Sequence, residues 1–318
     1  MKTFNLIEKN FLPIIILAIF SFFTACQEET SVQTSEPKTD KEAMIQIADE
    51  DSLLASFEPN YNEDGVMDVM GKINTPIYPV KVGQRMRLVN RVLDINIQGD
   101  TAYGTLTKTF EGTLYILAKY DTASTRPDTL ILKPFTSVIT RKLVFIKIAN
   151  TEFPKRNWVL AAVSLPEGGT QTPESINITR MTVFLPNGDT LVINSPNDYY
   201  LYRRWGFWWR WRNFPVVPAN SQLTIRVEVT SAYEQDDFVT LTFGADARGL
   251  HRAKKRFVLV SSTFNGTSYD KVYEQTFQTH QYRGFFHAVL NAMPGQVVLD
   301  DSAPVEQESW GVPYFIRP

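Results

Sequence analysis

The clearest secondary-structure signal in the chain is Leu93-Asp94-Ile95-Asn96-Ile97-Gln98-Gly99-Asp100-Thr101-Ala102. Its first six residues alternate between apolar and polar side chains, which is the period of a strand with one buried face. Gly99-Asp100 then supplies residue types that favour a tight hairpin turn into a second strand over Thr101–Phe110. We therefore predict antiparallel pairing here. Further strands are predicted at Thr113–Tyr120, Leu130–Ile139, Arg141–Ala149 and Trp158–Ser164.

The segment before this hairpin has a different period. Between Lys41 and about Met70, apolar residues recur at spacings of three and four, as they do on one face of a helix. Pro59 ends the first of two predicted helices, and the second is predicted over Asn62–Met70. Helices followed by a meandering antiparallel sheet predict an α+β N-terminal domain, with the helices covering one face of a curved sheet.

Several short motifs in this half are similar to those of a known family. They are Phe57 with Tyr61, Gln98–Ala102, Arg141–Phe145 and Asn157–Leu160. In this order they resemble the nuclear-transport-factor-type α+β roll over Lys41 to about Ser164. The resemblance implies a cone-shaped pocket, in which some members perform isomerase or dehydratase chemistry through a buried Asp, Tyr or His. The part of the chain before residue 165 contains no histidine, so such an enzyme is the alternative function and not the first.

The second half of the chain has almost no helical periodicity. Glu167–Thr170, with Pro173 after it, predicts a connection between an α+β roll at 41–165 and a second domain at 171–318. Short strands with regular turn signals resemble an all-β immunoglobulin-like sandwich. It would lack the inter-sheet disulfide, because the chain has one cysteine. The predicted strands are Ile176–Leu185, Thr190–Asn194, Leu223–Thr230, Phe238–Phe243, Arg256–Ser262, Tyr273–Gln278, Phe285–Leu290, Val297–Leu299 and Tyr314–Ile316.

The N-terminus has the composition of a targeting segment. Lysines precede an apolar run that is too short to span a bilayer, and small residues follow it. Thr24-Ala25-Cys26 resembles the lipobox of signal peptidase II substrates, although Phe23 stands where Leu is usual. We therefore predict a lipoprotein signal peptide at 1–25, lipidation of Cys26 and a flexible polar tether at 26–40. The predicted location is the cell envelope, attached to the outer membrane by the lipid.

The residues that follow Cys26 bear on which side of the membrane the protein faces. Gln27-Glu28-Glu29 resembles the acidic stretch that Bacteroidota place after the lipid-bearing cysteine of surface lipoproteins. This resemblance extends the prediction to exposure at the cell surface.

Composition and missing motifs exclude several function classes. Without residues 1–25 the chain carries 30 basic and 33 acidic side chains, which argues against a nucleic-acid partner. Nucleophile-elbow, zinc-protease and phosphate-loop motifs are absent, and the three histidines have no ligand spacing. Turn chemistry accounts for the acidic clusters Asn62–Gly65 and Asp300–Ser302 better than calcium does. We therefore predict no catalytic residue, metal site or cofactor.

The densest unusual composition lies between Tyr199 and Arg212, where four of the six tryptophans fall. A two-residue turn at Gly206-Phe207 would place Tyr202 opposite Trp211 and Leu201 opposite Arg212. One face would then be basic and the other aromatic, as protein interfaces and glycan-binding surfaces often are. Contact with lipid headgroups and ordinary packing are the alternatives. The candidate binding residues are Tyr200, Tyr202, Arg203, Arg204, Trp205, Trp208, Trp209, Arg210, Trp211 and Arg212.

A second basic run, His251–Arg256, precedes a predicted strand and is typical of a charged edge strand. Taken together, the sequence predicts a membrane-anchored envelope lipoprotein with a non-catalytic role. Its partner would be an envelope protein or a glycan, bound through the hairpin rich in Trp and Arg.

Overall fold

In the computed structural model, the alternating stretch around Gly99 forms the predicted hairpin. Strand β2 (Tyr78–Gln98) pairs antiparallel with β3 (Thr101–Lys119), and Gln98 lies opposite Thr101. Gly99 has a φ of +63°, which glycine adopts without steric cost. Strand β4 (Thr129–Lys147) pairs with the other edge of β3. These strands are longer than predicted. Strand β3 continues through Gly112. The ring of Phe135 packs in the space that a Cβ atom at position 112 would occupy.

The structure describes residues 36–51, 54, 62–68, 76–121, 126–171, 175–203, 211–245 and 252–317. Residues Pro37–Pro318 form one compact unit, separate from Met1–Glu36. The predicted signal peptide and Cys26 lie outside the described residues. No helix within the described ranges is long and apolar enough to cross a membrane.

The predicted α+β class is wrong, because the described chain is mostly β-strand. One predicted helix is present as α2 (Asp40–Glu50), whose first turn is capped by Thr39. The segment predicted as a second helix is instead β1 (Asn62–Asp68), which pairs with β2. Its Asn, Asp and Gly residues are weak helix formers, so pairing with an available strand edge decides its conformation. The other helices, α4 (Pro154–Asn157) and α5 (Gly295–Leu299), are short.

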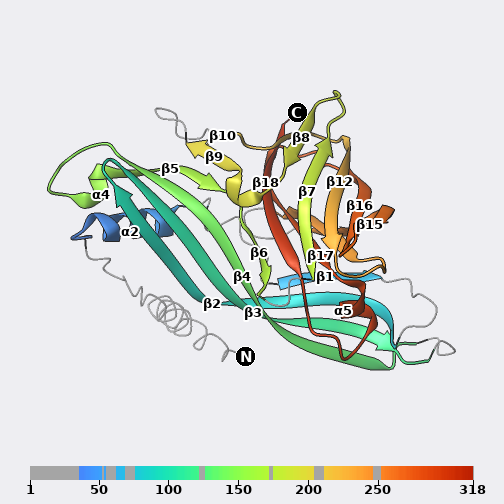
Figure 1. Ribbon diagram of the computed structural model, residues 1–318. Coiled ribbons are helices and arrows are strands. Elements are labelled where there is room, and N and C mark those ends of the chain that lie inside the picture. The colour runs from blue at the N-terminus through green and yellow to red at the C-terminus, as the bar shows by residue number, and fades with distance from the viewer. Residues whose placement is uncertain are drawn as a thin grey trace, which may run out of the picture. The chain divides into compact units, whose positions relative to one another are not determined.

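Two sheets hold the described strands (Figure 1). The larger sheet has the order β1-β2-β3-β4-β6-β18-β17-β13-β14, with β5, β9, β10 and β11 attached beside this path. The new strands are β5 (Trp158–Ser164), β6 (Glu167–Thr170), β9 (Tyr200–Arg203), β10 (Trp211–Arg212), β11 (Val216–Pro218), β13 (Phe238–Ala245), β14 (Ala253–Arg256), β17 (Gly284–Met293) and β18 (Glu308–Arg317). Among these pairings only β11 with β18 is parallel.

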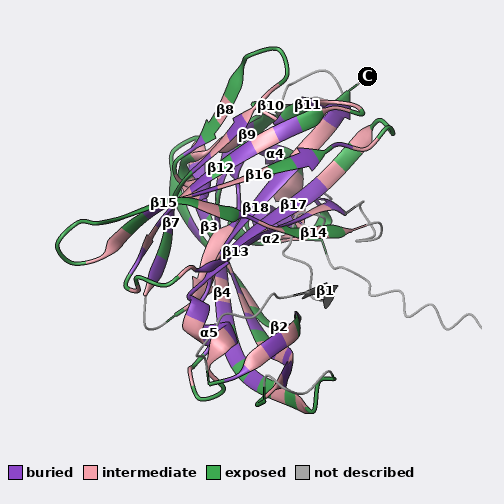
Figure 2. Cartoon of the chain, turned by 90° about the vertical axis from the view of Figure 1, so that its right-hand side faces the viewer, coloured by how far each residue is buried: buried purple, intermediate pink, exposed green. Residues whose placement is uncertain are grey.

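The second sheet has the order β15-β16-β12-β7-β8. These strands are β7 (Ile176–Phe184), β8 (Thr190–Ile193), β12 (Gln222–Ser231), β15 (Val258–Phe264) and β16 (Tyr269–Gln278). It packs on the larger sheet, since Val227 and Phe277 share one core cluster with Leu290 and Trp310. Figure 2 shows how buried residues alternate with exposed ones along these strands.

The immunoglobulin-like part of the predicted fold class is also wrong. The strands predicted there are largely present, apart from Val297–Leu299, which lies in α5. They do not make a sandwich of their own, because β13, β14, β17 and β18 belong to the sheet that contains β2, β3 and β4. Strand β6 makes this connection by pairing with β4 on one edge and β18 on the other. The domain boundaries at 165 and 171 stay predictions.

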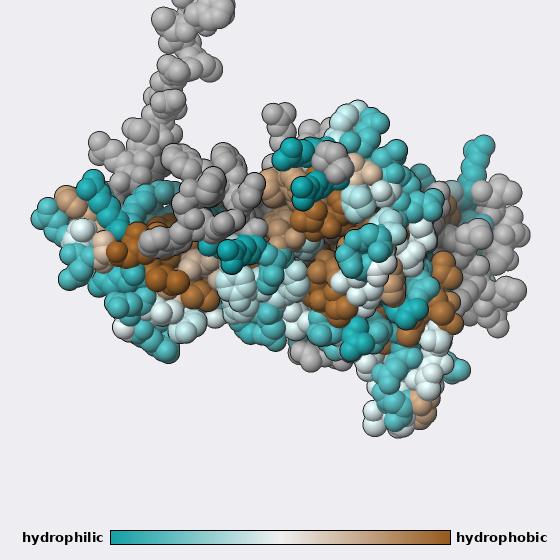
Figure 3. Space-filling model, turned by 90° about the horizontal axis from the view of Figure 1, so that it is seen from above, coloured by the Kyte–Doolittle hydropathy of each residue, from teal (hydrophilic) through white to brown (hydrophobic). Residues whose placement is uncertain are grey.

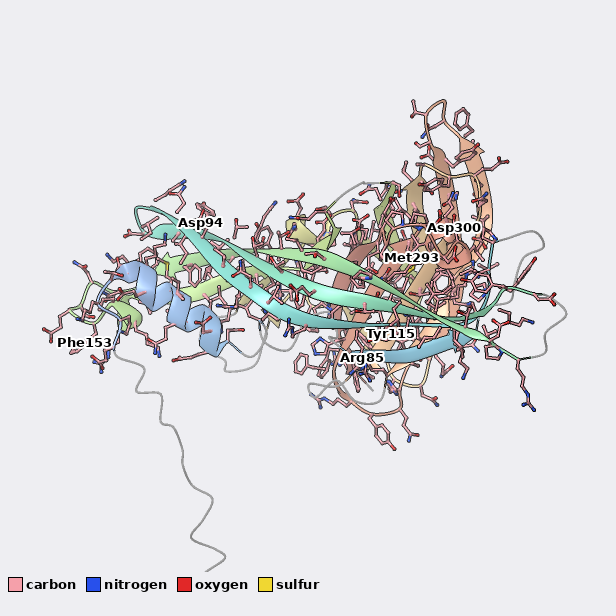
Figure 4. All side chains as sticks on the ribbon, turned by 90° about the horizontal axis from the view of Figure 1, so that it is seen from below. Arg85, Asp94, Tyr115, Phe153, Met293 and Asp300 are labelled. Atoms are coloured by element: carbon pink, nitrogen blue, oxygen red, sulfur yellow. The ribbon has the colours of Figure 1, made fainter. Side chains whose placement is uncertain are left out.

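Helix α2 covers one face of the β2–β4 region, as Figure 4 shows from below. Its buried Met44 and Ala48 share a core cluster with Leu93, Phe145 and Leu201. Ion pairs at the rim add to this contact, between Lys41 and Asp94 and between Asp49 and Arg91. On the opposite face of these strands, Val92 and Tyr103 are each 50% exposed.

Candidate functional site

The candidate hairpin begins and ends in two short paired strands. In β9 and β10, Arg203 lies opposite Trp211 and Tyr202 opposite Arg212. The antiparallel pairing is as predicted, but its register differs by one residue from that of a two-residue turn at Gly206-Phe207. A one-residue shift changes which residues share a face, so the predicted separation into basic and aromatic faces does not hold at the described positions.

Several of the candidate binding residues lie outside the part of the chain that the structure describes. They are Arg204, Trp205, Trp208, Trp209 and Arg210, and for Trp211 only the backbone is described. The described site therefore consists of Tyr200, Tyr202, Arg203 and Arg212 with their neighbours.

The two faces of β9 have different roles. Leu201 is fully buried in the core beneath α2, and Arg203, on the same face, forms an ion pair of 3.7 Å with Asp51. That carboxylate is nearly buried, and its Oδ1 accepts a hydrogen bond from the backbone N–H of Leu54. Arg203, whose side chain is 53% exposed, thus links β9 to Asp51, the residue that follows α2.

Tyr200 and Tyr202 lie on the other face of β9, since side chains alternate along a strand. Their ring centroids are 6.2 Å apart, and Tyr202 is 46% exposed. Arg212 is exposed and directly opposite Tyr202, so it lies on this same face.

A third tyrosine joins this face from a distant part of the sequence. The register runs from Tyr202 to Ala162 on β5, from Ala162 to Val144 on β4, and from Val144 to Tyr103 on β3. Directly opposed residues share a face of a sheet, so Tyr103 and Tyr202 project on the same side. Tyr103 is 50% exposed. Only the small side chains of Val144 and Ala162 lie between the two tyrosines in this row.

An ion pair borders the tyrosines. Lys142, opposite Thr105 on β3, donates a hydrogen bond of 2.8 Å from Nζ to Oδ1 of Asp198 in the 3-10 turn η1 (Pro196–Asp198). This hydrogen bond raises the pKa of Lys142 and lowers the pKa of Asp198. Partial burial raises the pKa of the Tyr200 hydroxyl. At neutral pH the pair is therefore charged and the tyrosine keeps its proton.

We call Tyr103, Tyr200, Tyr202, Lys142 and Arg212 the tyrosine surface. A backbone turn supports it, because the Tyr199 hydroxyl donates to the carbonyl of Asn213 at 2.8 Å. Asn213 has a φ of +59°, in the left-handed region that asparagine tolerates. Sequence reasoning missed Tyr103 and Lys142. Nothing in the sequence linked these two residues to β9 and β10, which lie much further along the chain.

Other sequence candidates have structural explanations. Asp300 accepts hydrogen bonds from the backbone and hydroxyl of Ser302, as expected for a turn. His280 stacks on Phe286 at 5.1 Å. The basic run contributes β14, which ends the order of the larger sheet and is therefore an edge strand, as predicted. Within the described ranges no group of three or more His, Cys, Asp or Glu residues is placed to hold a metal ion.

An apolar cavity of about 60 Å³ lies between the two sheets, lined by residues such as Met181, Phe277 and Ala288. It is smaller than cavities that hold even a benzene ring, which are near 150 Å³. We regard it as a packing defect of the core. On the outer surface, apolar residues appear in separate patches among polar ones on the face seen in Figure 3.

Comparison with models of known protein families gives no match, and comparison with curated protein sequences gives none either. The features that bear on function are therefore the geometry of the tyrosine surface and the N-terminal sequence.

Proposed function

We propose that this protein is a lipid-anchored component of a bacterial cell envelope and that it is a non-catalytic binding protein. Its contact region is the tyrosine surface with the adjoining segment rich in Trp and Arg. The partner is an envelope protein or a glycan. Attachment through diacylated Cys26 would hold the folded part at the outer membrane, since two acyl chains give lasting membrane binding.

The observation that carries this proposal is the division of β9 into two faces. Leu201 and Arg203 are used for packing and for an ion pair beneath α2, whereas Tyr200 and Tyr202 are left on the open side. Tyrosine and arginine are enriched at protein contact sites because each combines an apolar body with a polar end. Next to them in the sequence stand the tryptophans at 205, 208 and 209.

The lipid anchor is tested by intact mass of the native protein beside a Cys26→Ala variant. Acyl mass on a chain that begins at Cys26, lost in the variant, is the expected result. An unacylated native chain would overturn the anchor. Protease treatment of whole cells then distinguishes exposure at the cell surface from a location inside the envelope.

The contact region is tested by a photo-crosslinking residue placed at Tyr202 in cells. We expect covalent adducts with an envelope protein or with carbohydrate. The matched position is Tyr282, which is 68% exposed and lies outside the tyrosine surface. If positions 202 and 282 give the same adducts, the tyrosine surface is not a specific contact region.

A further inference from the structure

We infer that the tyrosine surface binds an acidic oligosaccharide. This inference rests on the proposed function and narrows it from a general contact region to one class of ligand. It also extends the binding region from β9 and β10 across β5 and β4 to Tyr103 on β3.

The spacing of the tyrosines suits an extended chain of sugar rings. Tyr103 and Tyr202 are separated by three steps between adjacent strands, which is roughly 14 Å at the usual strand spacing. Val144 and Ala162 between them have small side chains, so the row holds no large group between the two aromatic rings. The ring centroid of Tyr200 lies 6.2 Å from that of Tyr202, and Tyr103 projects on the same side of the sheet as Tyr202. The three rings therefore belong to one surface.

The polar groups of this surface are fixed in place. Nζ of Lys142 and the carboxylate of Asp198 are joined at 2.8 Å, and both side chains are largely exposed. Together they offer donors and an acceptor to hydroxyl groups, while the tyrosine rings offer apolar faces to the sugar rings. Asn96, opposite Tyr103 on β2, adds an exposed amide. A few oriented polar groups among aromatic ones are typical of sites that bind small polar ligands.

A protein partner fits this arrangement less well. The centres of protein interfaces are depleted of charged residues, whereas here Lys142, Asp198 and Arg212 stand among the tyrosines.

The preference for an acidic ligand follows from Arg212. Arg212 is exposed and pairs with Tyr202 across the two strands, and no ion pair among the described residues includes it. Arginine binds carboxylate and sulfate groups of a ligand through two parallel hydrogen bonds. Lys142 is less available to an acidic ligand than Arg212, because the carboxylate of Asp198 already balances the charge of Lys142.

The test uses the full mature chain with Cys26→Ala, titrated calorimetrically with hexamers of galacturonate and alginate and with neutral cellohexaose and maltohexaose. We expect an acidic hexamer to bind with a Kd below about 1 mM, and more tightly than either neutral one. Tyr103→Ala and Arg212→Ala should each weaken binding by roughly tenfold, as loss of an anchoring contact does. Tyr282→Ala should leave the affinity unchanged.

The outcomes separate this inference from the proposed function. Absence of binding by all four hexamers would overturn the oligosaccharide assignment, while protein adducts at position 202 in cells would keep the contact region. Equal binding of neutral and acidic hexamers would overturn the role given to Arg212. If Tyr202→Ala weakens binding but Tyr103→Ala does not, the extension to β3 is wrong. Circular dichroism of each variant distinguishes lost binding from lost folding.

Discussion

Lys271 and Asp237 form an ion pair in which neither side chain is exposed, with 2.8 Å between Nζ and Oδ2. Lys271 lies on β16 of the second sheet, and Asp237 immediately precedes β13 of the larger sheet. The carboxylate also accepts hydrogen bonds from the hydroxyls of Ser231 and Tyr273. The pair therefore joins the two sheets through a fully hydrogen-bonded buried network.

Removing one member of this pair should be strongly destabilising. Lys271→Met leaves a buried carboxylate without its cation, which costs about 3–5 kcal/mol in comparable cases. Urea unfolding followed by tryptophan fluorescence measures the loss. The double variant Lys271→Met, Asp237→Leu is the control, and it should lose less than the single variant. A single-variant loss below about 1 kcal/mol would contradict the buried pairing.

Arg203 and Arg212 should differ in what they support. Arg203→Ala leaves the nearly buried Asp51 without this ion pair, so we expect a loss of about 1 kcal/mol in the free energy of unfolding. Arg212→Ala should change stability by less than about 0.5 kcal/mol, because its side chain is exposed. Thermal unfolding of the two variants measures both. Equal losses would place Arg212 in a structural role and remove it from the binding surface.

Strand β6 should tolerate no side chain at Gly168. A Cβ atom there would lie 1.9 Å from the carbonyl oxygen of Val138, because β6 is held between β4 and β18. We expect Gly168→Ala to cost more than about 4 kcal/mol or to prevent folding. Gly284→Ala is the matched substitution, since its nearest neighbour atom is 3.4 Å away. Soluble yield and melting temperature compare the two variants, and similar values would be inconsistent with the tight placement of β6.

Filling the apolar cavity should stabilise the protein. Ala288 lines the cavity of about 60 Å³, and Ala288→Val adds two methyl groups to it. We expect a gain of about 0.5–1 kcal/mol, seen as a higher melting temperature. Ala292→Val is the comparison, because Ala292 is fully buried and does not line this cavity. Overpacking there should cost about 1–3 kcal/mol. If Ala288→Val lowers the melting temperature as much as Ala292→Val does, the cavity has no room for the added methyl groups.

The contribution of Lys108 to the stability of the protein should rise with pH above about 8. Desolvation lowers the pKa of Lys108 from 10.5 to about 8, and the charge of Arg141 adds to this effect. Between these two values the unfolded chain binds more protons at Lys108 than the folded chain does. The free energy of unfolding therefore gains up to about 1.4 kcal/mol per pH unit in this window. Below about pH 8, Lys108 is charged in both the folded and the unfolded chain, so the full desolvation penalty of its charge lowers the free energy of unfolding.

Urea unfolding of the native protein and of Lys108→Met at about pH 7.5, 8.5 and 9.5 measures this contribution. The slope of the difference between the two proteins belongs to Lys108. A difference that stays constant across the window would mean that Lys108 keeps its ordinary pKa.

Local patterns predicted individual strands well. The Gly99-Asp100 turn and β5 were predicted because their signals, a turn-forming pair and an apolar run, depend only on neighbours in the sequence. The predicted fold class was wrong, because the fold class depends on which strand edges pair with one another, and neighbouring residues do not determine that pairing. Residues 62–68 became a strand through pairing with β2, and β6 joined two halves that the sequence divided at its glycines.

In the candidate site, too, local sequence predicted some features and strand pairing determined the others. The composition at Tyr200–Arg212 drew attention to β9, but the register of its pairing with β5 and β10 determines which of its residues share a face. Arg203 stays a predicted binding residue, and its ion pair with Asp51 could not be foreseen from the sequence. Tyr103 was left out because its place on the same face as Tyr202 depends on pairings across four strands.

The position of β6 also has a consequence for how the chain folds. Gly169 and Glu308, which lie side by side in the larger sheet, are separated by more than a hundred residues of sequence. Strand β18 follows the other strands along the chain, yet it occupies the middle of the sheet. Bringing such distant segments together lowers the conformational entropy of the chain before the hydrogen bonds between the strands can form. Pairings of this kind therefore slow folding. The edges of β6 and β17 therefore stay open until β18 is added, and this interval is when the chain is most exposed to aggregation.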